Sequence, residues 1–344
     1  MNSLFSDVIN FGKPDLSRRF SFMDIGARGG IGWPWSKLPS ELLSVVLVEP
    51  DPEEAEKLQQ QIAATGGGLV LPFALWRNEA ELSLNINRWP ATSSLYPANH
   101  SFLDQFPESD RFHAERKISI QAYNIDFLAA NKKLPNVDFI KVDVQGAELP
   151  ILEGGEKTLT AELIGLEVEV EFTEMYSGQP LFGDVDRFVR EKIGLELWDL
   201  HTVHWKYRSG MKSSGPSKGR VIFGDALYLR PLTNIESWLD ALPTQVAKEK
   251  AAMLVIAAIA YGYIDYASAV LQNAAVARHL DPIVKIAFEK GIAMTTSGFR
   301  PFKYGNRYLH WLFNALAQGL RPTYKGWAYA GNGLGNKRRG PFWR

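Results

Sequence analysis

The sequence predicts an α/β fold with a mostly parallel sheet that continues into an α-helical extension. Between Phe20 and Arg230, short apolar runs typical of buried strands alternate with helical patterns. A glycine-rich turn follows the first strand, and the second strand ends in an acid, which is the order found in doubly wound sheets. Beyond Pro231 the composition shifts to alanine and apolar helix formers, which marks the extension.

The composition limits the class of protein. With 344 residues, 46% of them hydrophobic and 22% charged, the chain can form a sizeable core and is long enough for two domains. Its 38 basic and 38 acidic residues cancel, so no overall field attracts nucleic acid. The lack of cysteine excludes disulfides, thiolate zinc sites and cysteine nucleophiles. We expect a cytoplasmic protein, because the first residues do not resemble a secretory signal and the apolar run 251–264 is too short for a membrane span.

The first strand and its turn, Phe20 to Gly32, organise the fold. Apolar alternation up to Met23 is followed by Asp24 and by glycines at 26, 29, 30 and 32. Glycine admits positive φ and lets the main chain approach a ligand closely. The spacing differs from the G-x-G-x-x-G of dinucleotide-binding proteins, which disfavours a pyrophosphate. It favours a nucleoside-type ligand, with S-adenosylmethionine the leading candidate and a purely structural turn the alternative.

The next segment predicts a short helix over 38–43, a strand over 44–48 and a second helix. Asp51 is a suitable N-cap for this second helix, Pro52 suits its first position and Glu54 completes a capping box. Glu49 then stands at the carboxyl end of the second strand, where doubly wound folds place the acid that binds ribose hydroxyls. The alternative is a solvated strand end.

Further strands are predicted over 69–75, 81–87 and 117–122, and a strand over 137–143 ends at Asp143 before a short helix. The loop 89–99 is either a surface connection or a lip over the ligand. The remaining elements are strands over 163–170, 195–205 and 220–229 and a helix over 184–193, with a linker at 209–218 rich in Ser, Gly and Lys.

The stretch D-F-I-K-V-D-V-Q-G-A-E, residues 138–148, resembles the hallmark of the FkbM family of S-adenosylmethionine-dependent O-methyltransferases. The resemblance extends to MDIGARGG, LVEPDP, FALW, SSL, Asn124 to Asp126, EVEFTEMYSGQPLF and FGDALYLR, and so covers about Phe20 to Arg230. It implies a Rossmann-like class I methyltransferase sheet of seven strands whose last hairpin is antiparallel. Arg28 departs from the small or amide residue that is more usual in this turn.

The resemblance and the element order give candidate site residues. We expect the cofactor to be bound by Asp24, Gly26, Ala27, Arg28, Gly30, Glu49, Asp51, Ala74 and Asp143. We expect the acceptor to be bound by Ser93, Ser94, Glu148, Tyr176 and Gln179.

An acceptor hydroxyl also needs a group that takes its proton. The catalytic candidates are Asp143, Glu169 and His204, with Glu171 and His201 as further possible bases. Each histidine has a structural alternative. Asp143 and Glu169 could instead hold a divalent metal, but no further ligand cluster is visible, so we assign no metal. Lys141 is expected to balance the charge of Asp143.

These residues predict an O-methyltransferase that transfers a methyl group to a hydroxyl of a sugar, a glycan or a related small molecule. The alternative is a non-catalytic scaffold that retains the methyltransferase fold. An NAD-dependent oxidoreductase is disfavoured because G-x-G-x-x-G is absent. The expected partner is the acceptor, and no nucleic acid is expected.

Four segments are predicted: a leader at 1–19, the methyltransferase domain at 20–232, a helical accessory domain at 233–323 and a basic aromatic tail at 324–344. The accessory domain should contain helices over 246–261, 264–278, 282–290 and 308–318. The tail combines Lys and Arg with Trp, Tyr and Phe and has no acid, so we expect it to dock on an anionic membrane or a lipid-linked glycan. A disordered solubilising tail is the alternative.

Overall fold

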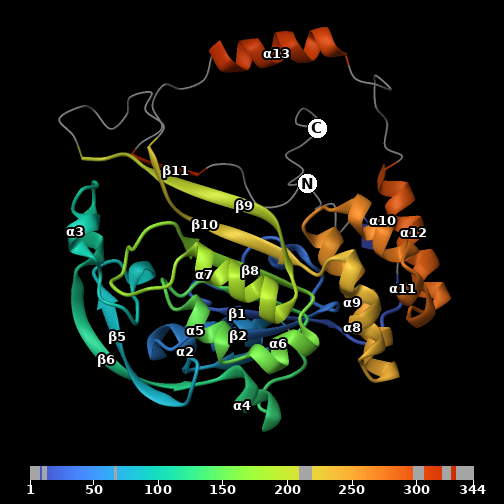
Figure 1. The fold of residues 1–344 in the computed structure, drawn as a ribbon, viewed down its shortest axis with the longest axis horizontal. Helices are drawn as coiled ribbons and strands as arrows, with labels where there is room; N and C mark the ends of the chain where they lie inside the picture. Colours follow the sequence, from blue (N-terminus) through green and yellow to red (C-terminus); the bar gives the residue numbers. More distant parts are fainter. Residues whose placement is uncertain are drawn as a thin grey trace.

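The computed structural model describes residues 8–9, 14–65, 68–208, 219–296, 306–319 and 327–330. Its main sheet has the order β11-β9-β10-β8-β7-β1-β2-β3 (Figure 1). Strands β3, β2, β1, β7 and β8 are parallel, and β10 is antiparallel to both β8 and β9. The predicted seven-stranded methyltransferase sheet with an antiparallel hairpin is therefore confirmed, and β11 adds an eighth strand. The strands of this sheet are β1 (Phe20–Ile25), β2 (Leu43–Val48), β3 (Leu69–Leu71), β7 (Phe139–Val142), β8 (Gly165–Glu171), β9 (Glu196–Trp205), β10 (Arg220–Leu229) and β11 (Ala328–Ala330).

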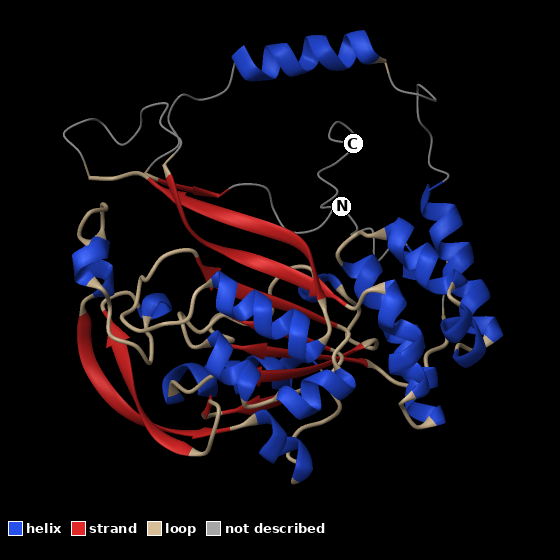
Figure 2. Cartoon of the chain, viewed as in Figure 1, coloured by secondary structure: helices blue, strands red, loops and turns tan. Residues whose placement is uncertain are grey.

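Helices cover both faces of the sheet (Figure 2). One face packs against α2 (Pro52–Thr65) and α9 (Thr244–Ala260). The other face packs against α4 (Ile125–Ala130), α5 (Glu148–Glu153), α6 (Glu156–Glu162), α7 (Phe182–Phe188) and the π-helical turn Val189–Ile193. Because β1, β2 and β7 are buried on both faces, they are mostly apolar, whereas β8 alternates apolar residues with the buried Glu167, Glu169 and Glu171.

A second sheet of three strands, in the order β4-β6-β5, stands beside the carboxyl ends of the main strands. It consists of β4 (Ala74–Leu75), β5 (Ala80–Asn87) and β6 (Ala114–Tyr123). The prediction of a single strand over 69–75 is therefore wrong. The strand is interrupted at Pro72, so that β3 joins the main sheet and β4 joins the second sheet. Between β5 and β6 lie α3 (His100–Leu103) and the 3-10 turns Pro90–Thr92 and Ser109–Phe112.

The helix predicted over 38–43 does not form. A 3-10 turn, Trp35–Lys37, comes earlier, and Leu43 already pairs with Phe20 in the β1–β2 ladder. The Trp35 indole covers the sheet face instead, stacked on Phe20 and Phe22 with ring centroids 4.9 Å away in each case. Pro39 also opposes a helix here, because it disfavours helical geometry at the residue before it.

The C-terminal helices share a core with the sheet. Tyr261, at the end of α9, stacks on Phe139 of β7 with ring centroids 5.4 Å apart, and the buried residues of α9 join the same apolar cluster as β1. The segment expected as an accessory domain thus supplies, together with α2, one of the two helical layers. The helices are α8 (Leu232–Asp240), α9, α10 (Ile264–Gln272), α11 (Ala274–His279), α12 (Pro282–Thr296) and α13 (Arg307–Gly319).

Two corrections concern the C-terminal segment. The helix predicted over 264–278 is two helices, because the Asn273 side chain accepts the backbone N–H groups of Ala275 and Val276 and caps α11. Part of the expected tail belongs to the sheet, because β11 pairs with β9 and the Trp327 indole donates to Glu108 at 3.0 Å. The linker 209–218 and the rest of the tail lie outside the described residues. Among the described helices, none is long and apolar enough to cross a membrane.

A buried ion network joins α9 to the sheet. Lys250 is fully buried, and its Nζ donates to Asp138 Oδ1 at 2.9 Å and to the carbonyls of Val137 and Glu162. Arg18 binds both carboxylate oxygens of Asp138, at 2.6 and 2.7 Å. Burial opposes the charge of Asp138, but Lys250 and Arg18 hold its pKa below the usual range. A buried pair of this kind is costly to break, since one charge is then left without its partner.

We predict that Lys250→Met lowers the free energy of unfolding by about 3 to 5 kcal/mol, because Asp138 and two carbonyls lose a buried donor. Lys248→Met, at an exposed position on the same helix, is the control and should cost less than about 0.5 kcal/mol. Urea unfolding of the full chain measures both. Equal stabilities would show that the network does not fasten α9 to the sheet.

Candidate active site

A pocket of about 190 Å³ lies at the carboxyl ends of β1, β2 and β7 and is closed on one side by the β5–β6 sheet. Its position is the usual ligand site of an open α/β sheet. The walls from the main sheet include Ile25, Gly26, Val48, Glu49 and Asp143, and those from the second sheet include Ala74, Leu84, Ile86 and Ile120. The wall from the main sheet therefore carries carboxyl groups beside apolar residues, and the wall from the second sheet is apolar.

Gly26 lies where the ends of β1, β2 and β7 meet beneath this pocket. Its φ is +85°, and a Cβ at this position would lie 1.9 Å from the carbonyl oxygen of Asp143. Its N–H donates to the Val48 carbonyl at 3.0 Å, while the Asp143 N–H donates to the Ile25 carbonyl at 3.0 Å. The ends of β1, β2 and β7 can meet this closely only if residue 26 has no side chain.

Glu49 supplies a carboxylate to the wall formed by β2. Its Oε1 accepts the Asp51 N–H at 2.9 Å, and burial, more than any neighbour, raises its pKa. Arg28, which departs from the family pattern, binds Asp51 at 2.8 Å and approaches Glu54 to 3.7 Å. Burial acts to raise the pKa of Asp51, but the hydrogen bond from Arg28 lowers it below its usual value. Arg28 therefore ties the glycine turn to the start of α2 and also lines the pocket.

Gln145 is the centre of a hydrogen-bond network at the opposite end of the pocket. Its Nε2 donates to Asp143 Oδ1 at 3.1 Å and to Glu169 Oε2 at 2.5 Å, and its Oε1 accepts the Tyr176 hydroxyl at 2.9 Å. Its φ is +60°, a conformation that is uncommon outside glycine and is often found at functional sites. Lys141 completes the network at 3.3 Å from Asp143 and 3.8 Å from Asp24.

The two carboxyl groups that Gln145 joins have opposite pKa shifts. Burial opposes the charge of Asp143, but Lys141, Gln145 and Glu169 lower its pKa. Burial, followed by repulsion from Asp143, raises the pKa of Glu169 well above its usual value. Two interacting carboxyl groups titrate as a unit, so the arrangement is one carboxylate and one carboxylic acid that share a site.

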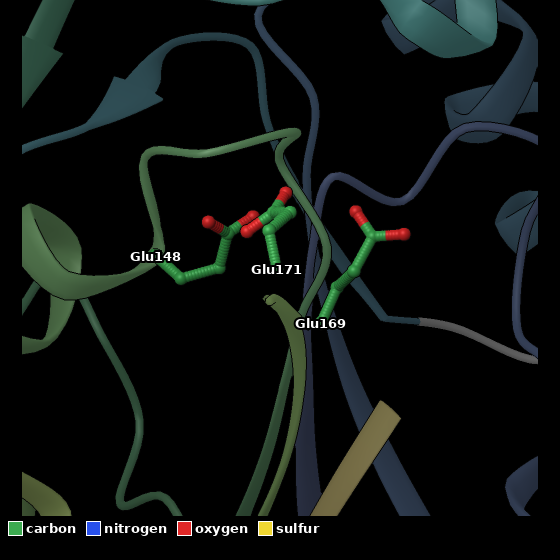
Figure 3. Close-up of side chains that lie close together, drawn as sticks. All are labelled: Glu148, Glu169 and Glu171. Atoms are coloured by element: carbon green, nitrogen blue, oxygen red, sulfur yellow. The ribbon is translucent and has the colours of Figure 1, made fainter. Parts of the chain in front are cut away.

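Glu148, Glu169 and Glu171 form a buried acidic cluster in which one oxygen of each lies within 4.8 Å of the others (Figure 3). Glu148 accepts the N–H groups of Val144 and Gly146 at 2.9 and 3.1 Å, but burial still raises its pKa to about 7. Burial and the charge of Glu148 raise the pKa of Glu171 well above its usual value. Protonation thus limits the charge of the cluster. The alternative in which Asp143 and Glu169 hold a metal stays a prediction.

Some predicted residues line the pocket, and others support its walls. Gly26, Arg28, Glu49, Ala74, Ser93 and Asp143 line it, whereas the remaining cofactor and acceptor candidates do not. Asp24 lies below the turn beside Lys141, and Ala27 is in the apolar core. Gly30 faces Gln61, and Asp51 is held by Arg28.

The acceptor candidates position the Gln145 loop. The Ser94 hydroxyl donates to the Gln145 carbonyl at 2.6 Å, and Gln179 Oε1 accepts the Tyr176 N–H at 2.5 Å. Tyr176 is fully buried and reaches Gln145 from below. The Glu148 carboxyl group accepts hydrogen bonds from two backbone N–H groups of the same loop. These residues therefore shape the site without lining the pocket.

The two histidines lie elsewhere on the sheet. His204 pairs with Val221, so β10 separates it from β8 and it does not line the pocket. His201 Nδ1 lies 3.0 Å from Asp225 Oδ2. The acids Asp143 and Glu169 are thus the candidate bases that the structure brings together.

Residues 24–193 match the model of the methyltransferase FkbM domain. This segment is a methyltransferase FkbM domain. The 2-O-methyltransferase NoeI of Sinorhizobium fredii (strain NBRC 101917 / NGR234) is 25% identical to the chain over 139 residues, which cover 38% of the chain and 55% of NoeI. The chain thus spans about half the length of this curated relative.

Two solved structures have partial similarity to the chain. The FkbM methyltransferase of Methylobacillus flagellatus KT is 14% identical, with a TM-score of 0.34 over 64% of this chain and 52% of that chain. M. capricolum TrmK, solved with S-adenosylhomocysteine, is 7% identical, with a TM-score of 0.30 over 84% of this chain and 96% of that chain.

The FkbM domain implies S-adenosylmethionine, and the pocket fits it. The Gly26 turn leaves room for close approach of a ligand, Glu49 can accept ribose hydroxyls, and apolar walls such as Leu84 and Ile86 suit an adenine ring. Sequence reasoning missed Gln145 and the walls from β5 and β6. Gln145 was visible inside the V-D-V-Q-G-A-E stretch, whereas the β5–β6 wall depends on packing that no local pattern reports.

We predict that Gly26→Ala abolishes S-adenosylmethionine binding and destabilises the fold by several kcal/mol, because the new Cβ meets the Asp143 carbonyl. Gly29→Ala is the matched control. Its φ is +81° but no atom lies within 4 Å of a Cβ there, so only about 1 to 2 kcal/mol of left-handed strain is expected. Chemical unfolding and calorimetric titration of both variants measure the difference. Equal effects would mean that strain, and not the close approach, explains the glycine.

We also predict that stability falls as pH rises through about 7. The folded-state pKa of Glu148 is raised to about 7, so its contribution is complete below its unfolded value and is lost as the pH passes the folded value. Glu148→Gln keeps an acceptor for the two N–H groups and should reduce the loss by roughly 1 to 3 kcal/mol at about pH 8. Unfolding of the full chain between about pH 5 and 8 measures it. Exposed Glu156→Gln is the control, and an unchanged slope in Glu148→Gln would contradict the assignment.

Proposed function

We propose that the protein is an S-adenosylmethionine-dependent O-methyltransferase that acts on a hydroxyl of a sugar, a glycan or a related small molecule. The network in which Gln145 holds Asp143 beside Glu169, at the edge of the cofactor pocket, carries this proposal. A hydroxyl acceptor loses its proton during methyl transfer, and a carboxylate near the reacting oxygen can accept it. The similarity to NoeI supports transfer to oxygen.

The bound cofactor would supply an activated methyl group, so the chain must mainly bind, orient and accept a proton. Glu49 and the Gly26 turn would hold the cofactor. Asp143, whose side chain is 34% exposed, would accept the hydrogen bond of the acceptor hydroxyl, while Lys141 and Gln145 fix its position. Transfer of the methyl group to the acceptor oxygen would break its bond to the cofactor sulfur and leave S-adenosylhomocysteine, while the proton of the acceptor hydroxyl would pass to the Asp143 and Glu169 pair. Glu169 holds a proton until the pH passes its raised pKa, so the pair becomes a stronger proton acceptor as Glu169 ionises.

The acceptor class rests on the polarity of the site. Carboxylate, amide and hydroxyl groups of Asp143, Gln145 and Ser93 line the pocket, and such groups suit a polyhydroxylated acceptor.

Incubation of the full chain with methyl-labelled S-adenosylmethionine and a panel of monosaccharides, oligosaccharides and phenols tests the reaction. Transfer that yields a methoxy signal in the NMR spectrum of a sugar is the expected result. Methylation on nitrogen or carbon would contradict the proposal. Cofactor binding without transfer to any hydroxyl acceptor would instead favour the scaffold.

We predict that Glu49→Gln weakens S-adenosylmethionine binding by about 1 to 3 kcal/mol, because the ribose hydroxyls lose a charged acceptor. Glu56→Gln, at an exposed position of α2, should leave the affinity unchanged. Isothermal titration calorimetry distinguishes the two variants. If Glu49→Gln binds as tightly as the native chain, Glu49 only supports the end of the strand.

A further inference from the structure

Helix α13 (Arg307–Gly319) presents large apolar side chains to solvent and stands apart from the other helices (Figure 1). The side chains of Tyr308, Trp311 and Phe313 are 83%, 69% and 65% exposed. Three leucines of the same helix, Leu309, Leu312 and Leu316, are also exposed. A contiguous apolar surface of this kind is rare on a free globular protein and marks an interaction site.

Four of the exposed apolar residues form one face of the helix. Leu309, Leu312, Phe313 and Leu316 follow each other at intervals of three, one and three residues, which places them in a single stripe. Tyr308 flanks the stripe, Trp311 lies on the other face of the helix, and His310 lies across the helix from Leu312. This is the pattern of a helix that lies in the plane of a membrane surface, with its apolar side among acyl chains.

The sequence around α13 carries an extreme charge. Residues 290–344 contain ten Lys and Arg residues and no Asp or Glu. Residues 1–289 therefore hold the other 28 basic residues and all 38 acidic ones. Although the whole chain has no net charge, the segment that contains the exposed helix is strongly positive. Such asymmetry is typical of proteins that bind an anionic surface.

We propose that α13 docks the protein on an anionic phospholipid bilayer, with the apolar stripe inserted at the acyl boundary and the positive charge of residues 290–344 attracting the chain to the lipid phosphates. A bilayer offers both an apolar phase and negative charge. A second copy of the chain would bring two strongly positive segments together, and nucleic acid would leave the leucine stripe in water. The docking does not depend on the methyl acceptor.

The absence of cysteine from the chain allows a direct test. Leu312→Cys and His310→Cys place a single thiol on opposite sides of α13, and each is labelled with an environment-sensitive dye. With vesicles of phosphatidylcholine and phosphatidylglycerol, the dye at 312 should shift to the blue and the dye at 310 should not. A shift at 312 without vesicles that grows with protein concentration would show self-association and overturn the proposal, as would equal shifts at both positions.

Sedimentation of the unlabelled full chain with the same vesicles supplies the second measurement. The double variant Leu312→Ser with Leu316→Ser should lose about tenfold or more in partition, because two inserted side chains of the stripe are removed. Ile283→Ser, at a position on α12 that is 74% exposed, is the control and should partition like the native chain. Vesicles of phosphatidylcholine alone should bind more weakly by about fivefold for each basic residue that contacts the surface. Equal binding by the double variant, or equal binding to neutral vesicles, would overturn the proposal.

Discussion

The contact between the glycine turn of β1 and the end of β7 is the constraint on which the site depends. Gly26 meets the Asp143 carbonyl at a distance that admits no Cβ, and its N–H binds the end of β2. Three strand ends therefore converge. This convergence sets Glu49 on one side of the pocket and Asp143 with Gln145 on the other, so that polar groups from several strand ends face one cavity. The helices and the ion network around Asp138 hold the strands in this register.

Several acidic side chains can be buried at this edge because each either accepts hydrogen bonds from a donor or is protonated. Both lower the free-energy cost of burying a carboxyl group. Lys141 and Gln145 stabilise the charge of Asp143, whereas burial favours the protonated forms of Glu148, Glu169 and Glu171. A row of ionised carboxylates would repel one another and could not stay buried. A row that shares protons can stay buried, and among the acids of this edge it leaves Asp143 as the ionised carboxylate that lines the pocket. Carboxyl groups that share protons also suit a reaction in which the chain needs to accept one proton.

Local patterns in the sequence predicted much of the fold and part of the site. The glycine turn, Glu49 and the strand that ends at Asp143 each depend on neighbours within a few residues, so sequence reasoning found them. The sequence predicts that Tyr176, Ser94 and Gln179 contact the acceptor; in the structure Ser94 and Tyr176 bond to Gln145, and Gln179 accepts the Tyr176 N–H. Long-range packing decides such roles, as it decides that α9 covers the sheet and that the second sheet closes the pocket. The ion pairs with Asp51 and Glu54 explain the presence of Arg28, which departs from the residue type that is more usual in this turn.

The pH dependence of single-turnover methyl transfer, measured in the native chain and in Glu169→Gln, tests the proposed proton-accepting pair most directly. The native rate should rise with pH as Glu169 ionises, since its pKa is raised. Glu169→Gln should bind S-adenosylmethionine normally, lose about 100-fold or more in rate and show no such rise. Glu169→Gln with the native rate and the native pH profile would contradict the account.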